Sequence, residues 1–100
     1  MKLDKLALAL YSLRSKFKVD STDILIINAV LEMRKQQGDV LTMQFLKNFK
    51  GASQATTHAR MKKLLQNGLL ARVGDDENLR IKKLEPTAKT TELVKYLGEL

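Results

Sequence analysis

Residues 53 to 68 read S-Q-A-T-T-H-A-R-M-K-K-L-L-Q-N-G, a stretch that begins and ends as a helix does. Ser53 can accept hydrogen bonds from the free N–H groups of a first helical turn. Gly68 can adopt the left-handed backbone conformation that commonly ends a helix. We expect the rest of the chain to be organised around this helix.

The two sides of this helix differ in character. Thr57, Met61 and Leu64 share one face at 3.6 residues per turn, which predicts that this face is buried. The opposite side is small, polar and cationic, with hydrogen-bonding groups first and positive charge further along. Such a side suits insertion into a DNA major groove, although a basic helix face that is simply solvated has the same pattern. The outward residues are Ala55, Thr56, Ala59, Lys62, Lys63 and Gln66, with Arg60 on a flank.

Composition excludes several classes of protein. With 100 residues and 44% hydrophobic content the chain makes one small domain, whose modest core a dimer contact would help to stabilise. The absence of cysteine excludes disulfides, zinc fingers and thiol chemistry, and it fits a cytoplasmic location. A single histidine indicates no metal site, and nothing indicates a cofactor. Asp4 and Lys5 interrupt the apolar amino-terminal stretch, so we expect neither a signal peptide nor a membrane span.

The net charge of +7 is concentrated in one segment. Residues 40 to 74 contain six Lys or Arg and no Asp or Glu. A surface of this kind suits phosphate groups, because cations near them release condensed counterions. Membrane binding would also use basic charge, but this segment has no Trp or Tyr, and its apolar face is needed for a core.

Two helices are predicted before this segment. Apolar residues recur every three or four positions over residues 1 to 19, which predicts a helix whose seam packs on its own domain or on a second chain. Asp20, Ser21 and Asp23 can cap a further helix, which Gly38 would end. The run of Ile and Leu at 24 to 27 could form a strand. The length of the pattern and the good helix formers after it favour a central buried helix instead.

A helix-turn-helix is predicted next. Thr42 can cap a short helix from 43 to about 49, with Phe45, Leu46 and Phe49 facing inward, after a strand-like pair at 40 and 41. Gly51 then allows a tight turn into the helix that Ser53 begins.

A β-hairpin, or wing, is predicted to follow. Residues 69 to 73 are strand-like, 74 to 78 are polar, and 79 to 84 alternate apolar and basic residues. Pro86 should stop the second strand, and Thr87 should cap the last helix. The expected fold is mainly α with a small β-hairpin, a winged helix-turn-helix with additional N- and C-terminal helices in a single domain, 1–100. Its expected parts are an N-terminal helix (1–19), a central helix (21–37), the helix-turn-helix (42–68), the wing (69–85) and a C-terminal helix (87–100).

The pattern S53-Q-A-T56-x7-L64-x3-G68-L69-L70-x-R72, followed by R80-x6-T87, resembles the winged-helix regulators of the MarR family. In that family a serine-started recognition helix ends in Gly-Leu-hydrophobic, and a wing arginine lies seven residues before a threonine. This sequence departs from the pattern at Asn78, Leu79 and Thr90, where the family has Asp, Arg and Gly. The resemblance implies a homodimer, joined through its terminal helices, that binds operator DNA specifically. Family members often respond to a small ligand or an oxidant, but no residue here indicates an effector site.

The sequence predicts one set of residues that contact DNA and another that forms the dimer. Arg80 is expected to enter the minor groove, while the acidic wing tip at 75 to 77 stays away from the DNA backbone. The residues expected to contact DNA are Thr42, Ser53, Gln54, Thr56, His58, Arg60, Lys62, Lys63, Arg80 and Lys82. Those expected to form the dimer are Leu3, Leu6, Leu10, Leu13, Phe17, Leu93, Leu97 and Leu100.

Three other functions fit the sequence less well than DNA binding. An enzyme is not expected, because no acidic residue stands beside His58 in the sequence to orient it, and carboxylates do not cluster near a base. RNA binding would favour exposed aromatic side chains, whereas the five aromatic residues sit at helical core spacing. The main alternative is a winged helix that binds an acidic protein partner or modulates the transcription or replication machinery without specific DNA readout.

Overall fold

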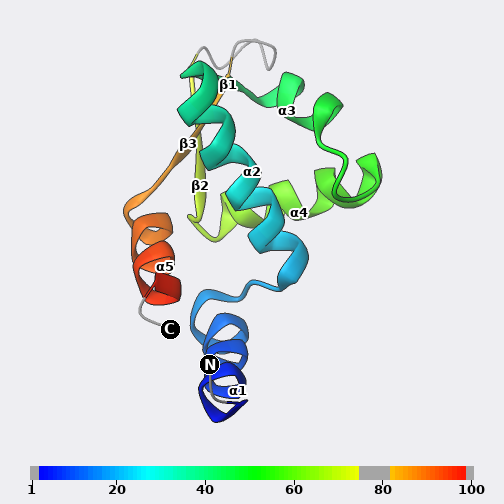
Figure 1. Cartoon of the computed structure of the whole chain (residues 1–100). Helices are drawn as coiled ribbons and strands as arrows, with labels where there is room; N and C mark the ends of the chain where they lie inside the picture. Colours follow the sequence, from blue (N-terminus) through cyan, green and yellow to red (C-terminus); the bar gives the residue numbers. More distant parts are fainter. Residues whose placement is uncertain (1–2, 75–81, 99–100) are drawn as a thin grey trace.

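The computed structural model describes residues 3–74 and 82–98. In this part of the chain one small sheet lies along the side of a helical body (Figure 1). The elements in order are α1 (Leu3–Ser12), the π-helical turn η1 (Leu13–Phe17), α2 (Ser21–Gln37), β1 (Val40–Leu41), α3 (Thr42–Asn48), α4 (Gln54–Gln66), β2 (Leu70–Val73), β3 (Lys83–Pro86) and α5 (Ala88–Gly98).

The sheet is antiparallel and has the order β1-β3-β2. Leu84 at its centre lies opposite Val40 on one side and Arg72 on the other, so the predicted pair at 40 and 41 does form a strand. β3 ends at Pro86, as predicted, and Pro86 itself still lies opposite Leu70. Proline is tolerated there because the end of a strand needs no further ladder donor.

The core gathers around α2, as predicted. Ile26, Ile27 and Val30 are buried, whereas Leu25 is 52% exposed, so one face of the helix is buried and the other is not. The turn η1, the helices α3, α4 and α5, and all three strands contribute to the same cluster, as do Val19 and Leu69 in the joins. Its further buried members are Leu13, Phe17, Val19, Val40, Phe45, Leu46, Met61, Leu64, Leu69, Leu70, Leu84 and Leu93.

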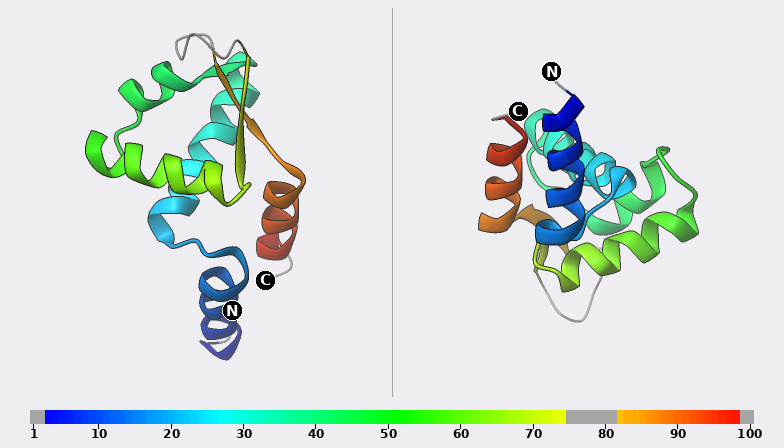
Figure 2. Two further views of the ribbon diagram at one scale, coloured as in Figure 1. Left: turned by 180° about the vertical axis from the view of Figure 1, so that it is seen from behind. Right: turned by 90° about the horizontal axis from the view of Figure 1, so that it is seen from below.

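The N-terminal helix is shorter than predicted. α1 ends at Ser12, and the wider π-helical turn that follows closes with the backbone N–H of Lys18 bonded to the carbonyl of Leu13. Leu13 and Phe17 in this turn are both buried. The predicted apolar seam therefore has two parts. Its end, in η1, packs in the core, whereas its first two turns, in α1, project from the body near α5 (Figure 2).

The helix-turn-helix is formed by α3 and α4. The capping role predicted for Thr42 was wrong, because Leu41 precedes the first turn and Thr42 lies within it. The Thr42 hydroxyl instead donates to the carbonyl of Lys82 at 2.9 Å, which ties α3 to the sheet. Gly51 in the turn is required by a close approach, since a Cβ there would stand 2.4 Å from Cζ of Phe49.

The limits and the buried face of α4 are confirmed. Ser53 Oγ accepts a hydrogen bond from the N–H of Thr56 at 3.1 Å, and Gly68 has a φ of +75°. Thr57, Met61 and Leu64 are buried. The inner face of α4 is therefore fixed in the core and the outer face remains for contacts.

α5 is attached to the end of α4 by two threonines. Thr87 and Thr90 cap α5 reciprocally, each hydroxyl accepting the backbone N–H of the other residue. The Thr87 hydroxyl also donates to the carbonyl of Gly68 at 2.6 Å, and the Thr90 hydroxyl donates to the carbonyl of Leu69. These bonds satisfy carbonyl groups of the turn that follows α4.

Substituting Thr90 by valine should lower the free energy of unfolding by about 1 to 3 kcal/mol, because the buried carbonyl of Leu69 then loses its donor and the N–H of Thr87 loses its acceptor. Thr91 is the matched control, since its side chain is exposed and Thr91→Val removes a hydroxyl of the same kind. Urea unfolding of both variants measures the difference. Equal losses would show that the two bonds of the Thr90 hydroxyl contribute nothing of their own.

Candidate nucleic-acid interface

The outer face of α4 is exposed along its length. α4 crosses the body beside α3, and its outer turns are not covered by another element (Figures 1 and 2). Two alanines keep this face low, so another molecule can approach the backbone closely. Its exposed residues are Gln54, Ala55, Thr56, His58, Ala59, Lys62 and Gln66.

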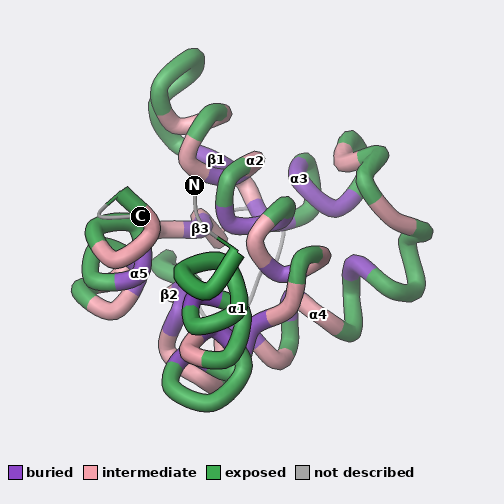
Figure 3. The backbone as a smooth tube through the Cα atoms, turned by 60° about the horizontal axis from the view of Figure 1, so that its bottom comes forward, coloured by how far each residue is buried: buried purple, intermediate pink, exposed green. Residues whose placement is uncertain are grey.

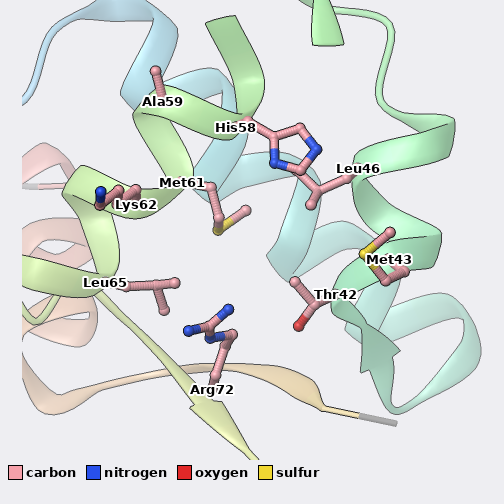
Figure 4. A pocket seen from close by; sticks show the side chains of 9 residues that line it. All are labelled: Thr42, Met43, Leu46, His58, Ala59, Met61, Lys62, Leu65 and Arg72. Carbon is pink, nitrogen blue, oxygen red and sulfur yellow. The ribbon is translucent and has the colours of Figure 1, made fainter. Parts of the chain in front are cut away.

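A hollow of about 450 Å³ separates α4 from α3 and β2. Buried Met61 and Leu46 make part of its wall, while His58, Lys62 and Arg72 bring polar groups to it from two elements (Figure 4). Arg72 extends from β2 toward the space below Thr42 and Leu65. The hollow thus combines an apolar wall with basic side chains.

A second hollow, of about 640 Å³, lies at the other end of the same two helices. It is lined by α3 residues up to Asn48, which include Lys47, and by Gln54 and His58 of α4. His58 borders both hollows, so the outer side of the helix-turn-helix is concave on either side of it.

Several cations on this surface have no acidic partner. Within the described ranges, no carboxylate pairs with Lys47, Lys62 or Arg72. The pattern agrees with the absence of acidic residues from 40 to 74. An anionic partner would therefore meet uncompensated positive charge here.

The two cations on the α2 side of α4 behave differently. Arg60 Nη1 lies 2.6 Å from Asp20 Oδ2, and Lys63 Nζ lies 3.5 Å from Asp23 Oδ2. Both carboxylates belong to the first turn of α2 and its cap, where each side chain accepts the backbone N–H of the other residue. Arg60 and Lys63 thus bind the protein itself.

The ion pairs with α4 affect the pKa of the Asp20 carboxyl. Burial by itself would raise the pKa of Asp20, but the backbone N–H of Asp23 and the charges of Arg60 and Lys63 outweigh it. The pKa therefore lies below the ordinary value of 3.8, and the ionised form is favoured in the folded protein.

The remaining residues predicted to contact DNA fall into four groups. Thr42 is 3% exposed, and its hydroxyl donates to the carbonyl of Lys82. Ser53 and Thr56 are exposed, but the Ser53 hydroxyl donates to Oγ1 of Thr56 at 2.9 Å. Lys82 lies just before β3, and its carbonyl accepts from Thr42. Arg80 and the wing tip at 75 to 77 lie outside the described residues.

Arg72 and Lys47 were not among the residues expected to contact DNA. Both belong to the acid-free segment, which was a sufficient reason to consider them. Arg72 was noted only as part of a family pattern, and its position beside α4 follows from the pairing of β2 with β3.

Some of the residues predicted to form the dimer are exposed, and others are buried in the protein's own core. Leu3, Leu6 and Leu10 are 82%, 41% and 53% exposed, so this side of α1 is largely open to solvent (Figure 3). Leu13, Phe17 and Leu93 are buried in the protein's own core, and Leu97 packs against it. Leu100 lies outside the described residues.

Comparison with known proteins gives a structural match. No family model matches the chain, and no curated protein matches it. A solved structure, "The crystal structure of transcriptional regulator Tm0710 from Thermotoga maritima", superposes with a TM-score of 0.58 at 17% identity. The match covers 96% of this chain and 66% of that one. The chain has a winged-helix fold.

This likeness confirms the predicted fold class, a mostly helical protein with a small antiparallel sheet. At 17% identity it is a likeness of fold, and the narrower resemblance to MarR regulators rests on the sequence pattern alone. No helix in the described ranges is long and apolar enough to cross a membrane.

The stability of the protein should fall in acid partly through Asp20. Because its folded pKa is lowered, its contribution is complete above the unfolded value near 3.8 and disappears as the pH falls through the folded pKa. The melting temperature of the wild type should therefore exceed that of Asp20→Asn at pH 6, and the difference should shrink by pH 2.5. A difference that stays constant with pH would contradict this assignment.

Proposed function

We propose that the protein binds double-stranded DNA through α4 and acts as a transcriptional regulator. The observation that carries the proposal is the outer face of α4, exposed and low, bordered by Lys62 and by Arg72 with no carboxylate partner. The fold match supports the proposal, since the matched structure is a transcriptional regulator.

Side chains along α4 suit different parts of a duplex. Gln54 lies in the first turn and is exposed, so its amide can donate and accept at base edges in a major groove. Ala55 and Ala59 keep the helix surface low, which permits this close approach. Lys62 lies two turns later, where a cation suits the phosphate backbone.

The elements beside α4 extend this surface. Arg72 on β2 and Lys47 on α3 border the hollows at its two sides, so cations flank the helix. Two phosphate strands border a major groove, and flanking charges of this kind can contact both. Arg60 and Lys63, which are paired with α2, are left out of the proposed contact set.

A homodimer is the second part of the proposal. α1 and α5 lie at the same end of the molecule, and α1 exposes Leu3, Leu6 and Leu10 there. Pairing these residues about a two-fold axis would remove them from water and present two copies of α4. Such a pair could read an inverted repeat with half-sites about 34 Å apart.

Replacing Lys62 by alanine should weaken binding to all duplexes alike and reduce the slope of log K against log salt by about 0.9, the value for one phosphate contact. Lys95→Ala is the matched control, because Lys95 is exposed on α5, away from the proposed surface. Fluorescence anisotropy at several salt concentrations measures both.

The same titration includes a single-stranded RNA and an acidic protein. If the wild type fails to bind the duplex yet binds the acidic protein, the interaction-module alternative replaces DNA binding. Equal losses for Lys62→Ala and Lys95→Ala would show only a response to total charge.

The dimer has its own test. Leu10→Glu should halve the mass measured by light scattering from twice 11.3 kDa to that of one chain, with the helical circular dichroism retained, because Leu10 is 53% exposed and outside the core cluster. Leu93→Glu is the contrasting variant and should unfold the domain, since Leu93 is 1% exposed. A wild type that scatters as a single chain would refute the dimer.

A further inference from the structure

The side of α4 that faces α2 carries an ion-pair cluster that the proposed DNA contacts do not use. Asp20 Oδ2 lies 2.6 Å from Arg60 Nη1, while Asp23 Oδ2 lies 3.7 Å from the same nitrogen and 3.5 Å from Lys63 Nζ. Two carboxylates of α2 thus share two cations of α4.

Asp23 needs these cations. Its side chain is fully buried, and although Oδ2 also accepts the N–H of Asp20, Oδ1 has no hydrogen-bond partner. A buried carboxylate is strongly disfavoured unless opposite charge compensates it. Moving Arg60 and Lys63 toward a DNA phosphate would therefore uncover the charge of Asp23.

Asp20 also separates these cations from others nearby. A hollow of about 460 Å³ is lined by Lys63 and Asp20 together with Arg14 and Lys18 of the chain before α2. In the described ranges, Arg14 and Lys18 have no carboxylate partner. Without the charge of Asp20, Arg60 would join these three cations in a continuous basic patch.

We infer that Asp20 and Asp23 form a carboxylate lock that withholds Arg60 and Lys63 from DNA phosphates and so limits sequence-independent affinity. Phosphate contacts strengthen binding to every duplex and carry no sequence information. Of the three Lys or Arg residues on α4, the lock leaves Lys62 for the backbone. A larger share of the binding energy then comes from base contacts such as that proposed for Gln54. The inference rests on the proposed duplex binding.

The lock is tested with Asp20→Asn. Asparagine is as good a helix cap as aspartate, so the variant keeps the cap of α2 and loses only the charge. It should bind a random-sequence duplex about fivefold more tightly at 0.15 M salt, with a slope of log K against log salt steeper by about 0.9, as expected for one added phosphate contact.

Glu32→Gln is the matched control. It makes the same change in net charge and releases Lys35, which pairs with Glu32 at 3.7 Å on the exposed surface of α2. This variant should change the affinity for random duplex by less than about twofold, since Lys35 lies outside the proposed surface. A similar gain in both variants would reduce the effect to net charge and overturn the lock.

A second substitution identifies the released cation. Arg60→Gln should leave the affinity for random duplex unchanged in the wild type and should remove most of the gain in Asp20→Asn. Loss of binding by Arg60→Gln in the wild-type background would overturn the lock, because Arg60 would then already contact DNA. Unfolding curves for every variant confirm that the comparison is made between folded proteins.

Titration of the wild type with duplex distinguishes failure of the lock from failure of the proposed DNA binding. If the wild type binds duplex and Asp20→Asn binds no more tightly, the lock fails and the proposed function stands. If neither protein binds duplex, both fail. If the wild type binds duplex, and Asp20→Asn but not Glu32→Gln binds it more tightly and with a steeper salt dependence, the lock and the proposed function are both supported.

Discussion

The attachment of α4 to the body is the constraint on which the rest of the structure depends. Its inner face is fixed by Thr57, Met61 and Leu64 in the core, and its flank is held by the carboxylates that begin α2. Its end is held from the other side, where the first residues of α5 donate to the carbonyls that follow it. A helix fixed in this way presents its outer face in one orientation, as readout of base edges requires.

This attachment also divides the charges of α4 by direction. Lys62 points to the open side, beside a hollow that Arg72 also lines, whereas Arg60 and Lys63 are consumed in contacts with α2. Net charge therefore overstates the positive charge available to a partner. The proposed dimer surface is separate from α4, because the exposed leucines of α1 lie at the far end of the molecule from the hairpin strands.

Sequence alone predicted what depends on neighbouring residues. Ser53, Asp20 and Gly68 act within one turn of their own position, so capping rules located both α2 and α4. The features that were missed depend on residues far apart in sequence. Arg60 meets Asp20 across 40 positions, and no local pattern distinguishes a cation paired with α2 from one that faces a partner. The π-helical turn was missed for a related reason: its register is set by the burial of Leu13 and Phe17, and a heptad pattern does not report it.

The most direct test of the account is a titration of ¹⁵N-labelled protein with a short duplex, followed by amide chemical shifts. We expect the largest changes along the outer face of α4, at Gln54, His58 and Lys62, and at Arg72 on β2. Amides of the α2–α5 side and of α1 should move little. Changes concentrated on α1 and α5 with α4 unaffected, or no changes at all, would contradict the claim that α4 is the surface that binds DNA.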